Sequence, residues 1–394
     1  MTHGRSGFFY GLKKMQHDVH IGLLASTEGT YKRMGLSTWS GVTHAVEEIN
    51  ADPAFDFHLV THSYNPGGEL EAYADGINQL ISAGAQHIFG TTTSASRKEI
   101  IPDLERMGCL LWYPCPYEGF ECSENVIYMG GCPNQNLIPL LRYAIAQFGA
   151  HAHLVGSNYV WGWESNRIAR ELVEVSNGQV LGEKYYRFGC TDFAGLIEQI
   201  VSDDTAFVLN NLVGESSYHF LRQLSDACGE RGRTLPVLSC NFTESELPCI
   251  RGADHIRLLS CGAFFESVKP SFVHQQHMRH GEQAYSHYYA CAYAAIHMFA
   301  QAYRRTGTDL PSAICETLYE QRSPTVLGEL VLSARNNHVA LPSYIAEAGR
   351  DGFTLLHSEP RSLTADPYLV QTDIAAFNEL GAKPLQRGNL RIVK

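Results

Sequence analysis

The chain has 394 residues, of which 44% are hydrophobic and 18% charged, and its formal net charge is −11. This composition is typical of a globular protein with sizeable cores, and the length favours two domains over one. The acidic balance and the lack of a long basic run argue against direct nucleic-acid binding, because phosphate neutralisation needs clustered Lys and Arg. No apolar stretch reaches the roughly 18 residues of a membrane-spanning helix, so we expect no membrane partner.

The first third of the chain alternates apolar strand patterns with helical spacing. Strands are expected at 19–25, 57–61, 87–90 and 109–113, and helices at 35–50, 69–83 and 94–107. Alternation at this spacing is typical of parallel strands joined by helices in a doubly wound sheet.

A second α/β series follows. Strands are expected at 153–157, 179–186, 206–210 and 235–239, and helices at 136–148, 161–175, 193–201, 216–228 and 284–303. Near the end of the chain, apolar runs at 343–347 and 353–356 flank Gly349–Gly352, which is the pattern of a hairpin.

We therefore predict an α/β fold of two doubly wound, Rossmann-like lobes joined by a hinge. The first lobe is expected to span 18–134 and the second 135–260, each with part of 260–350. Residues 336–394 are expected to form a C-terminal hairpin and tail. The pattern does not fix the points at which the chain crosses between the lobes.

Eleven cysteines are scattered along the chain without a CxxC pair. Their odd number and spacing match no zinc pattern, and free thiols in this number suggest a reducing compartment. Residues 1–20 lack the apolar core of a secretory signal, although a processed chain would lack one too. We therefore expect a cytoplasmic protein.

Several strand ends carry side chains that suit a binding cleft. The turn Thr91–Ser96 is rich in hydroxyls, and Leu111–Phe120 passes from an apolar strand into prolines, aromatics and a glycine. Ligands of open α/β sheets bind at the carboxyl ends of strands. A third strand end precedes Tyr159 and Trp161. These rings either wall a small pocket or pack in the core.

The common catalytic motifs are absent. The chain has no GxxxxGK[ST], GxGxxG, HExxH or GxSxG, which lowers the expectation of nucleotide, zinc-peptidase or α/β-hydrolase chemistry. His274, His277 and His280 could share one helix face, but a solvated polar face is the commoner outcome, so we predict no metal and no cofactor. Cys115 beside Glu118 is either a nucleophile or a small packing residue at a strand end, and packing is favoured.

Four segments carry a family resemblance: Gly90–Lys98 (GTTTSASRK), Tyr113–Phe120 (YPCPYEGF), Pro133–Asn136 (PNQN) and Gly156–Asn166 (GSNYVWGWESN). They resemble the type I periplasmic binding proteins of the amide and urea branch, most nearly the AmiC-type aliphatic amide sensors, over residues 18–370. The resemblance implies two lobes, three crossover segments, and closure on a small neutral amide. It implies a binding protein without enzymatic activity.

The ligand positions of that family carry over one by one. The resemblance implies that Ser94 hydrogen-bonds the ligand and that Tyr159 contributes a hydroxyl from the second lobe. Tyr113 and Pro116 would wall the pocket. Four positions depart from the sensors' pattern: Thr92 and Trp161 stand where the sensors have tyrosine, Cys115 where they have threonine, and Phe242 near a second-lobe threonine. These departures imply a ligand other than acetamide, or weaker binding.

The charge near the predicted cleft also bears on the ligand. A neutral amide needs a few donors and acceptors and an apolar wall, whereas an amino acid would need a carboxylate near its ammonium group. Glu28 and Glu118 are the candidates for that carboxylate, and Glu118 equally suits a structural capping or pairing role.

Three functional hypotheses follow. The main one is a cytoplasmic sensor of a small neutral amide or urea that regulates amidase operon expression: ligand closes the lobes and changes binding to a partner regulator, an RNA-binding antiterminator. The alternative is the solute-binding component of an ABC transporter for urea or short-chain amides. The third is an amidase-like enzyme using Cys115. The sequence leaves a homo-oligomer open, since surface patches cannot be read from it.

Overall fold

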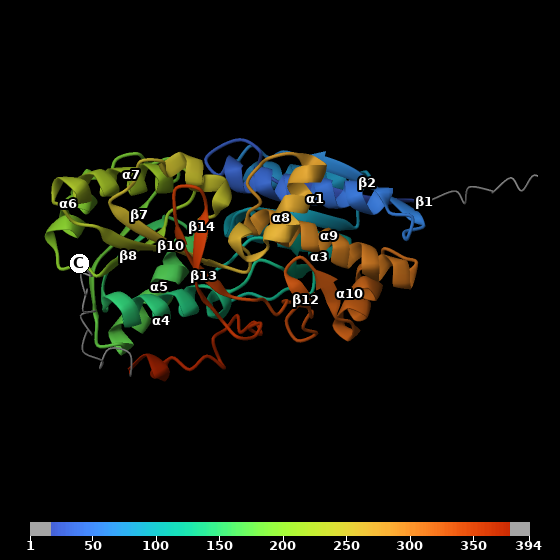
Figure 1. Ribbon diagram of the computed structural model, residues 1–394. Helices are drawn as coiled ribbons and strands as arrows, with labels where there is room; N and C mark the ends of the chain where they lie inside the picture. The colour runs from blue at the N-terminus through green and yellow to red at the C-terminus, as the bar shows by residue number, and fades with distance from the viewer. Residues whose placement is uncertain (1–16, 379–394) are drawn as a thin grey trace, which may run out of the picture.

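The computed structural model describes residues 17–378, and in these residues the chain folds into two lobes that lie side by side (Figure 1). Each lobe is built on its own β-sheet with helices on both faces. The predicted α/β class with two doubly wound lobes is confirmed. No helix among these residues is long and apolar enough to span a membrane.

The first lobe holds a five-stranded, all-parallel sheet with the order β2-β1-β3-β4-β5. Its strands are β1 (His17–Leu24), β2 (Phe57–Tyr64), β3 (His87–Gly90), β4 (Leu110–Tyr113) and β5 (Val126–Tyr128). Its helices are α1 (Lys32–Ala51), α2 (Glu71–Ser82), α3 (Ser94–Met107), α9 (His287–Thr306) and α10 (Pro311–Glu320). The apolar sides of α2 and α3 pack on one face of the sheet, and those of α1 and α9 pack on the other.

The second lobe holds a seven-stranded sheet with the order β14-β13-β10-β9-β8-β6-β7. Its parallel strands are β6 (His151–Ser157), β7 (Gln179–Tyr186), β8 (Phe207–Asn211), β9 (Leu235–Ser239) and β10 (Ile256–Gly262). Its helices are α4 (Leu137–Phe148), α5 (Val160–Val175), α6 (Ala194–Ser202) and α7 (Glu215–Glu230). The helices α4 and α5 cover one face of this sheet, and α6 and α7 cover the other.

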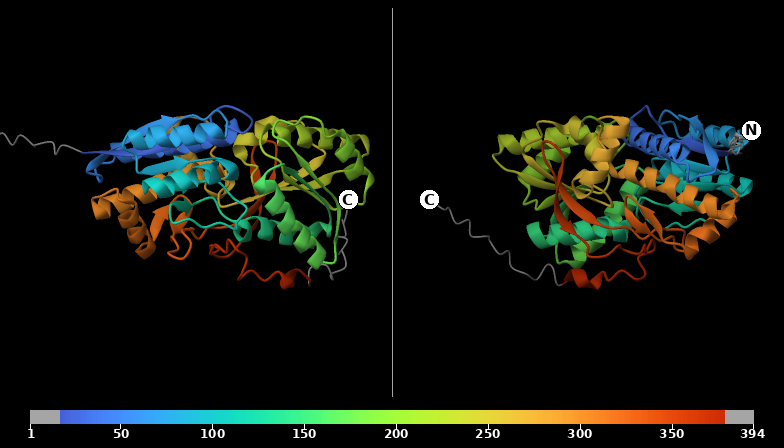
Figure 2. Two further views of the ribbon diagram at one scale, coloured as in Figure 1. Left: turned by 180° about the vertical axis from the view of Figure 1, so that it is seen from behind. Right: turned by 45° about the vertical axis from the view of Figure 1, so that its right-hand side comes forward.

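The C-terminal hairpin extends the second sheet. It consists of β13 (Tyr344–Ala348) and β14 (Phe353–Ser358), and β13 pairs antiparallel with β10. Figure 2 shows the hairpin against the second lobe, with the later residues running beneath it. The hairpin expected within 336–394 thus joins the second lobe, because the open edge of β10 supplies hydrogen-bond partners for β13. Residues 379–394 of that range lie outside the described part.

The chain passes between the lobes three times: between β5 and α4, between β10 and α9, and between the small β11–β12 ribbon and β13. The second crossover contains α8 (Pro270–His280), and the ribbon pairs β11 (Ser323–Thr325) with β12 (Gly328–Leu330). Short 3-10 helices lie at Pro133–Gln135, Glu244–Ile250, Glu266–Val268 and Ala375–Phe377. His287, at the start of α9, ties two crossovers together through hydrogen bonds to the backbone of Gly130 and Ala263.

Several elements were not anticipated: β5, β10, α8, α10 and the β11–β12 ribbon. Three of these strands, β5, β11 and β12, have only three residues each, which carry too little pattern to be read from sequence. They form because a neighbouring strand supplies hydrogen-bond partners. The helix α10 has ten residues, and it packs on α9.

Candidate functional site

A small cavity lies between the two lobes at the carboxyl ends of their strands. It is lined by Met34, Thr92, Thr93, Ser94, Cys115, Pro116, Tyr159, Trp161, Val213, Asn241 and Tyr288. Most of these residues directly follow β3, β4, β6, β8 or β9, which is where ligands of parallel sheets bind. The cavity volume is about 20 Å³, room for roughly one water molecule in this conformation.

The loop between β3 and α3 is shaped by its own sequence. Gly90 has φ +137°, and a Cβ there would lie 1.9 Å from the carbonyl oxygen of Leu24, so only glycine fits at this strand end. Thr93 then caps α3: its hydroxyl accepts from the Ser96 amide, and the Ser96 hydroxyl accepts from the Thr93 amide. The cap fixes Ser94 as the first helical residue, where it borders the cavity.

Polar atoms from both lobes line the cavity without protein partners. Trp161 Nε1, from the second lobe, and Thr92 Oγ1, from the first, are both buried and make no hydrogen bond among the described residues. A buried polar group without a partner costs about 1–3 kcal/mol, so these atoms indicate a place for a ligand or water.

The rest of the wall is neutral, and its polar groups are already engaged. Asn241 Oδ1 accepts from Ser239 Oγ at 2.7 Å, and the Tyr288 hydroxyl donates to the Asn241 carbonyl at 2.8 Å. Burial raises the pKa of the Cys115 thiol far above its usual range. A thiol held in its protonated form is a poor nucleophile, so the chemistry of this site disfavours the enzyme hypothesis.

A charged network lies behind the first-lobe wall. Ser94 Oγ donates to Glu118 Oε2, and Arg97, which is fully buried, places Nη2 3.4 Å from Glu118 Oε1. Arg97 also pairs with Glu121, with Nε and Oε1 2.7 Å apart. Burial alone would raise the pKa of Glu121, but Arg97, helped by Lys98, lowers it to about 2. The charges of Arg97 and Lys98 are thus compensated by those of Glu118 and Glu121, behind a cavity wall that is itself uncharged.

Six of the eight residues that the sequence suggested line the cavity: Thr92, Ser94, Cys115, Pro116, Tyr159 and Trp161. Tyr113 lies one layer back, where its hydroxyl donates to the carbonyl of Thr92 at 3.1 Å and the Arg97 guanidinium covers its ring at 4.6 Å. It supports the wall rather than forming its surface.

Phe242 is not among the lining residues, which corrects its expected place. It is buried in the second-lobe core, with its ring edge-on to Tyr218 at a centroid distance of 6.2 Å. Its neighbour Asn241 faces the cavity instead. Adjacent residues after a strand point in different directions, and sequence alone does not tell which of the two faces inward.

Five lining residues were not anticipated: Met34, Thr93, Val213, Asn241 and Tyr288. Val213 and Asn241 follow apolar strands, as the predicted residues do, so the same signal could have found them. Met34 and Tyr288 belong to the helices α1 and α9, and only the packing of those helices brings them to the cavity.

The lobes also touch outside the cavity. Arg33, at the start of α1, donates from Nη1 to the carbonyl of Ser245 in the second lobe at 3.3 Å. Elsewhere the guanidinium of Arg167 lies 4.8 Å above the ring of Phe120. These contacts, together with the small volume of the cavity, identify a closed arrangement of the lobes.

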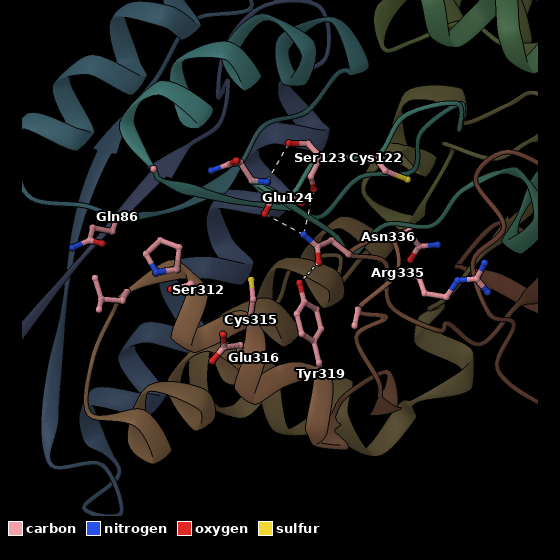
Figure 3. A pocket seen from close by; sticks show the side chains of 16 residues that line it. Gln86, Cys122, Ser123, Glu124, Ser312, Cys315, Glu316, Tyr319, Arg335 and Asn336 are labelled. Carbon is pink, nitrogen blue, oxygen red and sulfur yellow. Dashed lines mark hydrogen bonds between the residues drawn. The ribbon is translucent and has the colours of Figure 1, made fainter.

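A larger open pocket of about 770 Å³ lies elsewhere on the first lobe (Figure 3). Its lining comes from the segments before β3, β4 and β5, from α10 and from residues 334–337, and includes Glu124, Cys315 and Tyr319. It therefore opens at the amino ends of the strands, opposite to the edge where such sheets bind ligands. No second-lobe side chain is part of its lining, so lobe movement would not close it.

The three histidines considered for a metal do not form a centre. Within residues 17–378, no group of three or more His, Cys, Asp and Glu side chains is placed to hold a metal ion. His280 stacks on His44 with ring centroids 3.8 Å apart, and its Nε2 lies 3.1 Å from a Glu48 carboxylate oxygen. His277 Nε2 instead lies 3.3 Å from the carbonyl of Gln283.

Solved structures share this fold. The solute-binding protein of an ABC transporter from Rhodopseudomonas palustris HaA2, in complex with p-hydroxybenzoic acid, matches with TM-score 0.79 and 15% identity, covering 90% of this chain and 99% of that chain. The branched-chain amino acid transporter substrate-binding protein LivJ of Streptococcus pneumoniae, in complex with isoleucine, matches with TM-score 0.76 and 16% identity, covering 87% and 99%.

A third structure is in a closed conformation. It is the leucine-, isoleucine-, valine-, threonine- and alanine-binding protein of Brucella ovis, with TM-score 0.76 and 15% identity, covering 87% of this chain and 95% of that chain. At these identities the likeness is one of fold. These relatives are described as proteins that bind small molecules. The family model described as periplasmic binding protein domain matches residues 19–373, and the chain therefore belongs to the periplasmic binding protein family.

Proposed function

We propose that this protein binds a small neutral amide or urea between its lobes. The observation that carries the proposal is a pair of polar atoms, Trp161 Nε1 and Thr92 Oγ1, which have no partner among residues 17–378. The residues of this range that line the cavity include no charged side chain. An amide carbonyl would accept from the indole N–H, and the hydroxyl of Thr92 would accept from, or donate to, the other end of the ligand.

The size and charge of the cavity argue against larger or ionised ligands. The relatives named above hold isoleucine or p-hydroxybenzoic acid. An amino acid would bring two charges into a cavity whose lining has no charged partner, and burying unpaired charge is strongly unfavourable. A volume of about 20 Å³ also favours a ligand of few heavy atoms, admitted by modest opening of the lobes.

The comparisons favour the role of a solute-binding component of an ABC transporter, and we propose urea or short-chain amides as the ligands of that component. The three similar structures named above are binding proteins, and two are described as parts of transporters. In that role the closed lobes would deliver the ligand to a permease.

A second candidate is a cytoplasmic amide sensor acting through a partner regulator, with no direct nucleic-acid contact. Two observations support it. The segment Tyr113–Phe120, with its YPCPYEGF motif, resembles the amide sensors, and all eleven cysteines are free thiols. Such a switch works if ligand and partner prefer different lobe arrangements. Permease and ATPase genes beside the coding gene would favour transport, and an RNA-binding regulator gene would favour sensing.

The ligand class is tested by isothermal titration of the protein with urea, formamide, acetamide, propionamide, leucine and 4-hydroxybenzoate. Saturable binding of an amide or urea, weakened in Ser94→Ala and Tyr159→Phe, is the expected result. Binding of leucine or 4-hydroxybenzoate alone, or of none of these compounds, would overturn the proposal.

A further inference from the structure

We propose that Glu118 is a positioning residue that fixes the polarity of Ser94, so that the site accepts ligand N–H groups and rejects isosteric carboxylates. The inference rests on the proposed function and deepens it. It gives a role to the acidic residue of the YEGF segment, whose side chain lies outside the cavity lining.

The hydroxyl of Ser94 has its only proton committed. A serine hydroxyl has one donor and two acceptor lone pairs. Ser94 Oγ donates to Glu118 Oε2 and accepts a long hydrogen bond, 3.4 Å, from Arg97 Nη1. One lone pair of Ser94 Oγ remains for a ligand in the cavity. Ser94 therefore offers a ligand an acceptor and no donor.

The carboxylate that holds this proton is itself held in place. The Glu118 side chain is 1% exposed, and its Oε1 lies 3.4 Å from Arg97 Nη2 and 3.7 Å from Lys98 Nζ. The following residues are anchored too, because the amide of Phe120 donates to the carbonyl of Pro367 at 2.9 Å. Because Arg97 and Lys98 hold this carboxylate in place, it remains positioned to accept the proton of Ser94.

Two lining residues, Trp161 of the second lobe and Ser94 of the first, then present opposite polarity to a ligand. Trp161 can only donate, whereas Ser94 can only accept. A primary amide or urea has a carbonyl for the first and an N–H for the second. A carboxylate has the same shape but only acceptors, so one of its oxygens would face the lone pair of Ser94 near the Glu118 charge. The carboxylate therefore loses a hydrogen bond at Ser94 and meets a repulsive contact there. We expect the amide to bind at least about 100-fold more tightly than the carboxylate of the same shape.

The test compares acetamide with acetate by isothermal titration in Glu118→Gln and in a matched control, Glu121→Gln. Both variants remove one carboxylate that pairs with Arg97, but only Glu118 touches Ser94. In Glu118→Gln the amide group can donate to Ser94 and free its proton for the ligand. We expect the acetamide-to-acetate affinity ratio to fall at least tenfold in Glu118→Gln and to stay within about twofold of the parent in Glu121→Gln.

A double-mutant cycle shows whether Glu118 acts through Ser94. In a Ser94→Ala background, Glu118→Gln should leave the ratio almost unchanged. Glu118→Asp keeps the negative charge but withdraws the carboxylate by one methylene, and it should also lower the ratio; this variant carries the test if Glu118→Gln fails to fold. An unchanged ratio in both Glu118 variants, or an equal fall with and without Ser94, would overturn the inference.

Failure of the two proposals is distinguishable. If the parent protein binds none of the amides and no urea, the proposed function falls. If the parent binds acetamide but binds acetate equally well, the function stands and only the positioning role of Glu118 is overturned.

Discussion

Single residues in the cavity show where the protein leaves polar atoms for a ligand. The indole of Trp161 is 4% exposed, and its N–H has no partner in the described part of the chain, whereas the polar groups of Asn241 and Tyr288 bond within the protein. A group without a partner, such as the Trp161 N–H, gains a hydrogen bond when ligand enters, whereas the groups of Asn241 and Tyr288 only shape the wall. The affinity for ligand should therefore depend on the polar groups that have no partner in the protein.

Trp161→Phe tests this at the residue scale. Phenylalanine keeps an aromatic wall but removes the N–H donor, and the loss of one buried hydrogen bond of about 1 kcal/mol should weaken amide binding roughly fivefold. Isothermal titration measures the change. The control is Trp163→Phe, because Trp163 is exposed and its indole donates to Asn158 Oδ1 at 3.0 Å outside the cavity lining. Equal affinities in the parent and Trp161→Phe would contradict the role given to the indole.

At the scale of elements, the start of α7 and the start of α1 meet where the lobes close. Gly214 precedes α7 with φ +60°, and a Cβ there would lie 2.1 Å from the carbonyl oxygen of Thr30 in the first lobe. The adjacent Glu215 amide donates to the same carbonyl at 3.1 Å. This close approach of two backbones belongs to the closed arrangement, and only a glycine permits it.

Gly214→Ala should therefore oppose closure. Because ligand is enclosed by both lobes, shifting the lobe equilibrium toward the open form should weaken amide binding about tenfold or more. Titration calorimetry gives the affinity, and small-angle scattering shows whether ligand still makes the molecule more compact. Gly195→Ala is the matched control, since Gly195 lies in the exposed first turn of α6 with open space around its Cα. Parent-like affinity and compaction in Gly214→Ala would refute this account of closure.

Across the whole molecule, the crossovers between the lobes meet at a buried, neutral histidine. His287 Nδ1 accepts from the amide of Ala263 at 3.2 Å, and Nε2 donates to the carbonyl of Gly130 at 3.1 Å. A second proton on Nδ1 would break the first of these bonds. Burial, which disfavours the charged imidazolium, lowers the pKa of His287 to about 4.

Because the pKa of His287 is lower in the folded protein than in the unfolded chain, its contribution to stability decreases as the pH falls. In the unfolded chain a histidine titrates near pH 6.5, so the unfolded state takes up a proton between pH 6.5 and 4 that the folded state does not. The contribution of His287 to the free energy of unfolding is full above pH 6.5 and is lost as pH falls toward 4. Burial raises the pKa of Glu244 and of Glu246 to about 8, so their contribution to stability decreases as the pH rises. The pH dependence of the unfolding free energy of the parent is the sum of these opposite contributions.

His287→Gln isolates the histidine part. The variant should be less stable than the parent at pH 7.5. The difference in unfolding free energy should narrow by about 2 kcal/mol at pH 5, because only the parent has a histidine here that binds a proton on unfolding. Urea denaturation followed by circular dichroism at the two pH values measures this. His274→Gln, at an exposed site on α8, should show no such narrowing. A difference that is the same at both pH values would rule out a neutral buried His287.

The sequence by itself determined the alternation of strands and helices, and with it two doubly wound lobes, because burial on both faces of a parallel sheet imposes apolar strands and amphipathic helices. The sequence also allowed six of the lining residues to be predicted, because they follow strands and the carboxyl ends of parallel strands lie at one edge of a sheet.

Only the tertiary structure decided the rest. Phe242 turned into the core while Asn241 faced the cavity, and Met34 and Tyr288 reached it from helices packed on the opposite face of the first sheet from α3. The pairing of the hairpin with β10 depends on an open sheet edge, and the partnership of Ser94 with Glu118 depends on two loops 24 residues apart meeting. Such contacts arise from long-range packing, which local pattern does not encode.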